Sequence, residues 1–192
     1  MSKRVADALF PDIKMTYQEA EALYPPRNLP EGAVCTRFAP SPTGFMHIGG
    51  LYTALLNRIF TQSRGGVFFL RIEDTDQKRQ IENGVTEIIN ALGQFQIHFD
   101  EGAVGEAEDS GRYGPYRQSL RREIYQAFAK YLVEIDRAYP CFCTSDELEA
   151  IREKQEAAEA LQKGYYGEWA ACRELDEEAV LKRIANGDRW IV

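Results

Sequence analysis

The pattern of apolar and polar positions changes character near residue 32. Residues 33–38 form a short β-type run, and the residues after them, 39–44, are rich in the proline, serine and glycine that form turns. Apolar residues then recur at helical spacing through 48–60, until a pair of glycines ends the segment. This order predicts a strand that leaves through a stiff loop into a helix beginning near residues 47–50.

A second strand and a second helix are predicted next. Residues 67–72 form a nearly continuous apolar run, as expected of a strand covered on both faces of a parallel sheet. Asp74, Thr75 and Asp76 are residue types that cap helices, and the apolar stripe over 85–92 predicts the helix that they would begin. The chain therefore repeats strand and helix in the order typical of a parallel sheet.

A third repeat completes this pattern. After a glycine-rich connection at 100–114, apolar spacing predicts a long helix over 120–135 and a short strand around 138–142. Strand, helix, strand, helix, strand is one half of a doubly wound nucleotide-binding sheet with right-handed crossovers. We therefore expect an α/β fold in which residues 32–142 are the first half of a Rossmann-type parallel sheet.

The two flanking segments differ from this repeat. Residues 1–31 are expected to be an N-terminal helical extension, with a helix over 15–23, and we assign no chemistry to it. Residues 143–192 combine charged helices with a strand-like run at 189–192, and we expect them to be the start of an inserted α/β subdomain.

Composition narrows the class of protein. The 192 residues include 23 Lys+Arg and 30 Asp+Glu, a net charge of −7, which excludes a basic nucleic-acid coat protein but not an RNA partner for a local cluster of cations. No run approaches the roughly 20 apolar residues of a membrane helix, and the N-terminus lacks a signal core, so a cytoplasmic protein without a membrane partner is expected. Four cysteines are too few for a disulfide scaffold, and Cys35, on the first strand, is expected to be a small core residue.

The loop after the first strand is the first candidate site. Open α/β sheets bind ligands outside the carboxyl ends of their strands, which is where residues 37–50 would lie. Gly44, Gly49 and Gly50 allow a ligand to approach the backbone, and the start of the helix offers N–H groups and a positive dipole end to a phosphate. His47 adds a hydrogen-bond donor there. Taken singly, His47 also fits a helix cap, and the glycines also fit simple turns.

The whole string over 37–50, Arg-Phe-Ala-Pro-Ser-Pro-Thr-Gly-Phe-Met-His-Ile-Gly-Gly, resembles the nucleotide-binding signature of class I aminoacyl-tRNA synthetases, in the version found in glutamyl-tRNA synthetases. The resemblance covers about residues 33–192 and leaves the extension outside. It continues through four further segments, 70–76, 100–102, 114–119 and 138–143.

This resemblance implies an ATP site. Thr43, His47 and Gly49 would hold ATP, and His47 with the start of its helix would stabilise the charge that develops on the α-phosphate. Gly50 occupies the last motif position, where we expect it to pack beside the nucleotide. Mg²⁺ is expected together with the ATP.

The resemblance also implies the other substrates, L-glutamate and tRNA(Glu), and we expect the protein to be a monomer. Arg37 would pair with the side-chain carboxylate of glutamate, which suits a bidentate guanidinium. Glu73 would accept hydrogen bonds from the α-ammonium group. The remaining implied contacts are Ala39 and Ser41 in the amino-acid pocket, and Asp76 and Arg79 near the terminal adenosine of the tRNA.

Two clusters leave alternatives open. Four arginines occur without an intervening acid and would form either a tRNA-facing patch or the solvated face of one helix: Arg112, Arg117, Arg121 and Arg122. Cys141, Cys143 and Cys172 form either a zinc site or a group of reduced thiols in the core. Candidates for a fourth zinc ligand are Glu174, Tyr165 and Tyr166.

The chain lacks the second class I signature, a Lys-Met-Ser-Lys-Ser-type loop. We therefore expect an N-terminal fragment of a longer synthetase, with the second half of the sheet and an anticodon-binding domain after Val192, that does not charge tRNA alone. One alternative is a paralogue that attaches glutamate to queuosine in tRNA. Another is a catalytically silent binding module, against which the combination of Arg37, His47, Gly49 and Glu73 argues.

Overall fold

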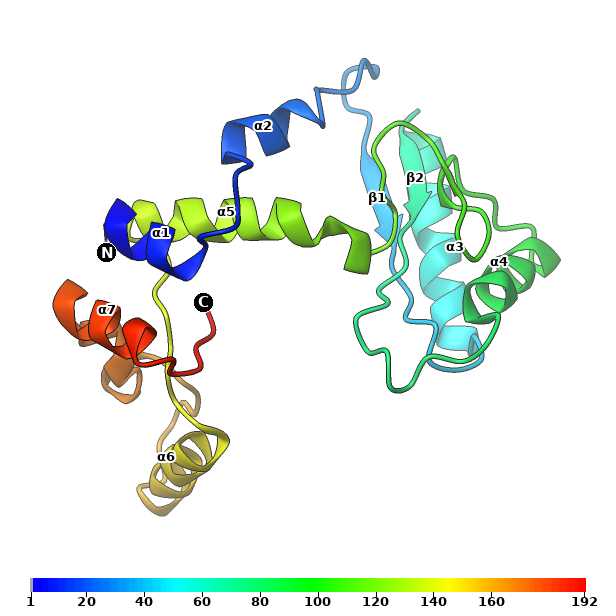
Figure 1. The fold of residues 1–192 in the computed structure, drawn as a ribbon. Helices are drawn as coiled ribbons and strands as arrows, with labels where there is room; N and C mark the ends of the chain where they lie inside the picture. The colour runs from blue at the N-terminus through cyan, green and yellow to red at the C-terminus, as the bar shows by residue number, and fades with distance from the viewer. Residues whose placement is uncertain (1) are drawn as a thin grey trace. The chain divides into compact units, whose positions relative to one another are not determined.

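A computed structural model describes residues 2–192 and divides them into two compact units (Figure 1). One unit contains the chain up to Ala20 together with Ile124–Val192, and the other contains Glu21–Glu123. These bounds differ from the domains expected at 1–31, 32–142 and 143–192, which stay a prediction. Within the described residues, none of the helices combines the length and the apolar character that a bilayer span requires.

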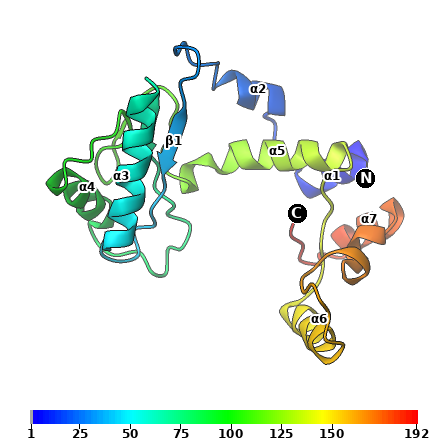
Figure 2. The same ribbon diagram turned by 180° about the vertical axis from the view of Figure 1, so that it is seen from behind.

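The unit over Glu21–Glu123 is built on one four-stranded sheet. Its strands are β1 (Cys35–Phe38), β2 (Val67–Leu70), β3 (Glu101–Ala103) and β4 (Asp109–Ser110). They lie in the order β1-β2-β3-β4, with β1, β2 and β3 parallel and β4 antiparallel to β3. Helices α3 (Ile48–Ser63) and α4 (Gly84–Gln94) form the two crossovers, which is the predicted α/β arrangement. Figure 2 shows α3 lying along β1.

Side-chain alternation along the strands places the core of this unit. Phe68 and Leu70 point to the same face of β2 and are fully buried. They pack in one cluster with Leu51 and Ala54 of α3 and with the apolar stripe of α4. Because both crossover helices contribute to this cluster, the helices and the sheet form a two-layer arrangement.

The other unit has a helical core. Its helices include α1 (Lys3–Leu9), α5 (Arg122–Glu134), α6 (Ser145–Ala157) and α7 (Glu177–Ala185), while α2 (Tyr17–Ala22) lies at the point where the chain changes unit. Short 3-10 turns of this unit occur at Gly167–Trp169 and Ala171–Glu174, and one at Ser119–Arg121, in the unit over Glu21–Glu123, leads into α5. Val5 of the N-terminal extension is fully buried in a cluster with Val133 and Val180. Phe10 adds an edge-to-face contact with Trp190 at 5.6 Å between ring centroids. The extension is thus part of a hydrophobic core.

The predicted strand at 138–142 and the predicted helix start at 74–76 were wrong. The segment 138–142 is not a sheet strand: Cys141 forms only an isolated antiparallel bridge with Ile191. The third parallel strand is β3, inside the expected glycine-rich connection, where Glu-Gly-Ala has no apolar run to mark it. Asp74, Thr75 and Asp76 do not begin a helix, because α4 begins at Gly84.

Two interpretations of single residues also change. Asp74 accepts hydrogen bonds from the backbone N–H and the hydroxyl of Ser119, so it caps the turn that leads into α5. Cys35 is exposed and is not a core residue, because β1 lies at one edge of the sheet that residues 2–192 form.

We predict that replacing Gly66 by alanine breaks the pairing of β1 with β2. A Cβ at Gly66 would lie 1.8 Å from the carbonyl oxygen of Val34, so one of the two backbones must move. The free energy of unfolding should fall by about 3 kcal/mol, measured by urea denaturation. Gly93 in α4 is the matched control, because its Cβ would meet nothing within 4 Å and alanine should stabilise that helix by about 0.5–1 kcal/mol. Equal destabilisation of both variants would contradict the assignment.

Candidate active site

A cavity lies at the carboxyl end of β1, where the chain turns into α3. Its volume is about 320 Å³. The loop over 40–47 forms most of its wall, and Ile88 of α4 contributes from the neighbouring helix. Four of the residues expected to bind ATP or glutamate line it: Ser41, Thr43, His47 and Gly50. The structure therefore brings part of the expected site to the sheet edge where open α/β folds bind ligands.

His47 is the N-cap of α3. Its backbone is extended, and its ring nitrogen Nδ1 accepts a hydrogen bond of 3.1 Å from the N–H of Gly49. An acceptor nitrogen carries no proton, so in the neutral ring the proton is on Nε2. The same residue thus caps the helix through Nδ1 and has a donor, Nε2–H, in the wall of a cavity next to the positive end of α3. The cap and the donor interpretations of His47 are compatible.

Gly49 and Gly50 lie so close to neighbouring side chains that a larger residue would clash with them. A Cβ on Gly49 would lie 2.9 Å from Cε1 and 3.0 Å from Nδ1 of His47. A Cβ on Gly50 would lie 2.8 Å from the sulfur of Met46, and packing of Gly50 beside a nucleotide stays a prediction. Gly49 therefore leaves the space in which the imidazole folds back on the first turn of α3.

Neighbouring elements hold the loop in place. The carbonyl oxygen of Pro40 accepts a 3.0 Å hydrogen bond from the N–H of Glu73, and that of Pro42 accepts one of 3.0 Å from Ile81. Gly84, at the start of α4, lies against Pro42 so closely that a Cβ would be 2.9 Å from the proline ring. These contacts fix the loop between the end of β2 and the start of α4, which suits a preorganised ligand site.

Arg37 and Glu73 are brought together at the ends of β1 and β2. Nη2 of Arg37 lies 4.0 Å from Oε1 of Glu73. The same carboxylate oxygen accepts a hydrogen bond of 2.9 Å from Nη2 of Arg71. Arg71 was not among the expected site residues, although a charged side chain directly after an apolar strand is the signal that marks it.

The remaining expected residues lie outside the cavity lining. Ala39 is half-buried between Phe38 and Pro40. Asp76 and Arg79 form an ion pair of 2.6 Å with each other at an exposed turn. Nothing in these contacts brings the pair to the cavity, and their contact with the tRNA stays a prediction.

The four arginines do not form one continuous patch. Arg117 is buried and paired with Asp109 at 2.7 Å. Arg121 lies over the ring of Tyr24 and donates to the carbonyl oxygen of Pro115 at 3.0 Å. Arg112 and Arg122 are exposed. Two of the four arginines, Arg117 and Arg121, therefore make contacts within the protein.

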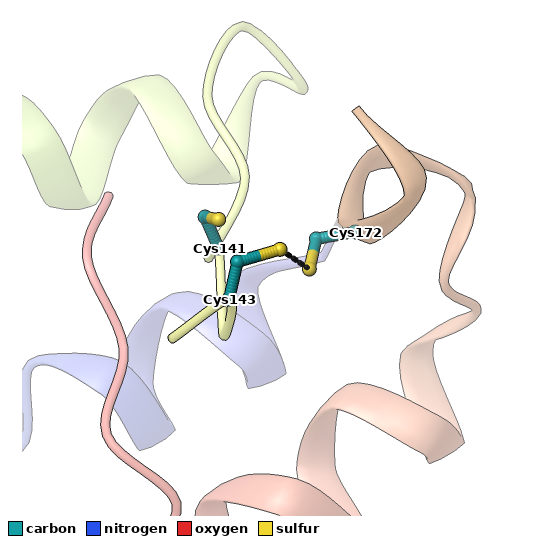
Figure 3. A group of neighbouring side chains, drawn as sticks. All are labelled: Cys141, Cys143 and Cys172. Atoms are coloured by element: carbon teal, nitrogen blue, oxygen red, sulfur yellow. Dashed lines mark hydrogen bonds between the residues drawn. The ribbon is translucent and has the colours of Figure 1, made fainter. Parts of the chain in front are cut away.

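Cys141, Cys143 and Cys172 come together in the helical unit, which contains Ile124–Val192 (Figure 3). Their sulfur atoms all lie within 4.8 Å of one another, and the sulfurs of Cys143 and Cys172 are 3.7 Å apart. The hydroxyl of Tyr165 is 3.3 Å from the sulfur of Cys141 and 3.2 Å from that of Cys143. Of the candidate fourth ligands, Tyr165 is the one that these contacts place at the cluster.

Burial and hydrogen bonds set the proton affinities of this cluster. Burial raises the pKa of the Cys143 thiol to about 11, and burial also raises the pKa of the Tyr165 hydroxyl. Burial opposes the thiolate of Cys172 too, but hydrogen bonds from the Phe142 N–H and from Tyr165 outweigh it and lower the pKa of Cys172. The surroundings of Cys172 therefore favour its thiolate, whereas those of Cys143 oppose one.

Comparisons with known proteins place this geometry in a family. Residues 33–192 match the family model described as tRNA synthetases class I (E and Q), catalytic domain. A glutamate–tRNA ligase of Acetivibrio thermocellus is 51% identical over 192 residues, covering 99% of this chain and 35% of the relative. One from Clostridium perfringens strain SM101 is 48% identical over 190 residues, covering 99% of this chain and 34% of the relative.

A solved structure supports the same placement. The crystal structure of a glutamate-tRNA synthetase from Elizabethkingia anophelis is 38% identical, with a TM-score of 0.71 over 83% of this chain and 32% of that chain. The chain thus spans about a third of the length of the relatives it matches.

The family model covers both the loop that lines the cavity and the cysteine cluster, and the resemblance seen in the sequence is confirmed. The chain belongs to the catalytic-domain family of class I tRNA synthetases specific for glutamate and glutamine.

Proposed function

We propose that the protein carrying this chain is a glutamate–tRNA ligase that forms glutamyl-adenylate from L-glutamate and ATP and transfers the glutamyl group to tRNA(Glu). The observation that carries the proposal is the cavity between β1 and α3, with Thr43 and His47 in its wall and Arg37 and Glu73 at the adjoining strand ends. The names of the relatives and the family match support the same activity.

In the first step, a carboxylate oxygen of glutamate attacks the α-phosphorus of ATP. A new oxygen–phosphorus bond forms, and the bond between the α-phosphorus and the oxygen that bridges to the β-phosphate breaks, which releases pyrophosphate. Mg²⁺ held by the phosphates of the nucleotide would neutralise part of their charge. Negative charge that develops on the α-phosphate would be stabilised by Nε2–H of His47 and by the positive end of α3. Arg37 would hold the side-chain carboxylate, and Glu73 the α-ammonium group.

In the second step, the 2′-hydroxyl of the last tRNA nucleotide attacks the glutamyl carbonyl and displaces AMP. The protein forms no covalent bond to the substrates in this step, so positioning of the reactants supplies most of the rate enhancement. Thr43 and Gly50 would contact the nucleotide, and Ala39 and Ser41 would line the amino-acid pocket.

Glutamate-dependent ATP–pyrophosphate exchange tests this activity. With tRNA present, the protein that carries this chain should exchange label with L-glutamate and not with L-glutamine, because Arg37 pairs with a charged side chain. Nuclease digestion of the charged RNA should release glutamyl-adenosine. Release of glutamyl-queuosine would instead support the queuosine-modifying alternative, and no exchange with glutamate would support a silent module.

Gly49→Ala tests the role of the first turn of α3. The added methyl group forces the His47 ring away from its hydrogen bond with the Gly49 N–H, so the exchange rate should fall about 100-fold, the usual cost of losing a transition-state donor. The thermal midpoint should stay the same or rise. His47→Ala should cost a similar factor, and the double variant should cost no more than either single one. Additive losses would show that Gly49 does not act through His47.

We further propose that Cys141, Cys143, Cys172 and Tyr165 hold zinc. Tetrahedral zinc with bonds to sulfur of about 2.3 Å requires sulfur–sulfur distances of about 3.8 Å. The 3.7 Å between Cys143 and Cys172, and the hydroxyl of Tyr165 at 3.2–3.3 Å, fit that geometry. A bound ion would cross-link the segment before α6 to the turn that contains Cys172 and would stabilise this unit.

Metal content tests the zinc site. The purified chain should contain one zinc ion, and removing it with a chelator should lower the thermal midpoint of the protein. Cys172→Ser should abolish binding, and Tyr165→Phe should weaken zinc affinity about tenfold or more. Cys35→Ser is the control, because Cys35 is exposed and lies in the other unit. Unchanged zinc content in Cys172→Ser would contradict the assignment.

A further inference from the structure

Two side chains of opposite charge face each other at the strand ends of the candidate site. Arg37 and Glu73 are 4.0 Å apart at their nearest atoms, and their side chains are 43% and 34% exposed. Under the proposed function, on which this inference rests, each must bind a different charged group of glutamate. Opposite charges this close attract each other, so a direct ion pair between the two would compete with the substrate for both.

Arg71 is the hydrogen-bond partner of the Glu73 carboxylate. Its Nη2 donates to Oε1 of Glu73 at 2.9 Å, the same oxygen that Arg37 approaches only to 4.0 Å. A hydrogen bond to an ionised group at this distance is stronger than a contact at 4 Å. The Glu73 carboxylate is therefore held by Arg71 and not by Arg37, although Arg37 is within reach.

The surroundings of Arg71 keep it in this position. It directly follows β2, and its backbone N–H donates to the carbonyl oxygen of Phe38 at 3.0 Å. Its side chain is 18% exposed, and its Nε is buried with no hydrogen-bond partner in the described part of the chain. A buried donor left unpaired is costly, so a guanidinium kept there calls for a compensating role.

We infer that Arg71 is a positioning residue for substrate binding. By occupying Oε1 of Glu73, it prevents Glu73 from closing on Arg37. Oε2 of Glu73 then remains for the ammonium group of glutamate, and the more exposed guanidinium of Arg37 remains for the side-chain carboxylate. The residue therefore acts on affinity for glutamate and not on affinity for ATP.

Kinetics of pyrophosphate exchange by the protein that carries this chain test the inference. Arg71→Gln should raise the KM for glutamate about tenfold or more while leaving the KM for ATP unchanged. Arg71→Lys, which keeps the charge, should recover part of the loss. Arg58→Gln is the matched control, because Arg58 forms an ion pair of 3.0 Å with Asp100 and has a similarly buried side chain, 21% exposed, away from the site.

A double variant separates positioning from direct contact. Glu73→Gln alone should raise the KM for glutamate, and adding Arg71→Gln should raise it no further, because Arg71 acts through Glu73. An equal further rise in the double variant would overturn the inference, as would parallel rises in both KM values from a general loss of structure. Normal exchange with an unchanged glutamate KM in Arg71→Gln would overturn the inference alone. No glutamate-dependent exchange by the unsubstituted protein would overturn the proposed function and the inference together.

Discussion

The parallel pairing of β1 with β2 is the constraint on which the candidate site depends. Register places Phe38 beside Leu70, so both strands end at the same edge of the sheet. Hydrogen bonds continue past that edge, from Arg71 to Phe38 and from Glu73 to Pro40. Because of this extension, the loop after β1 cannot move independently of the charged residues after β2. The same contacts direct the chain into α3 with His47 at its first turn.

A consequence is that charged and neutral parts of the site are positioned by different elements. The N-terminal start of α3, with its glycines, places a donor and a positive dipole end at the cavity. The strand ends place three charged side chains beside it: Arg37, Arg71 and Glu73. Under the proposed function, a phosphate and an amino acid would be bound by separate groups held at one edge of the sheet, which is the arrangement that a reaction limited by positioning requires.

Local periodicity was sufficient to predict α3, α4 and β2, because each buries an apolar face in one core. The β-type run over 33–38 predicted β1, which buries only Phe38 in that core. Local periodicity missed β3, whose three residues include Gly102 with a φ of +144° and whose strand character comes from its partner β2. The motif over 37–50 located most of the residues that line the cavity. The sequence did not predict which side chains form hydrogen bonds or ion pairs with residues far along the chain. Asp74 accepts a hydrogen bond from Ser119, 45 residues away, and Arg117 forms an ion pair with Asp109. Such contacts depend on the folded arrangement and leave no local pattern.

We propose that the edge formed by β1, β2 and the start of α3 binds glutamyl-adenylate. A crystal structure of the protein with a non-hydrolysable sulfamoyl analogue of that intermediate tests it most directly. We expect the sulfamoyl group beside His47 and the first turn of α3, the glutamyl carboxylate on Arg37 and the ammonium group on Glu73. An analogue bound outside the cavity between β1 and α3, or with its side chain turned away from Arg37, would contradict this proposed binding mode.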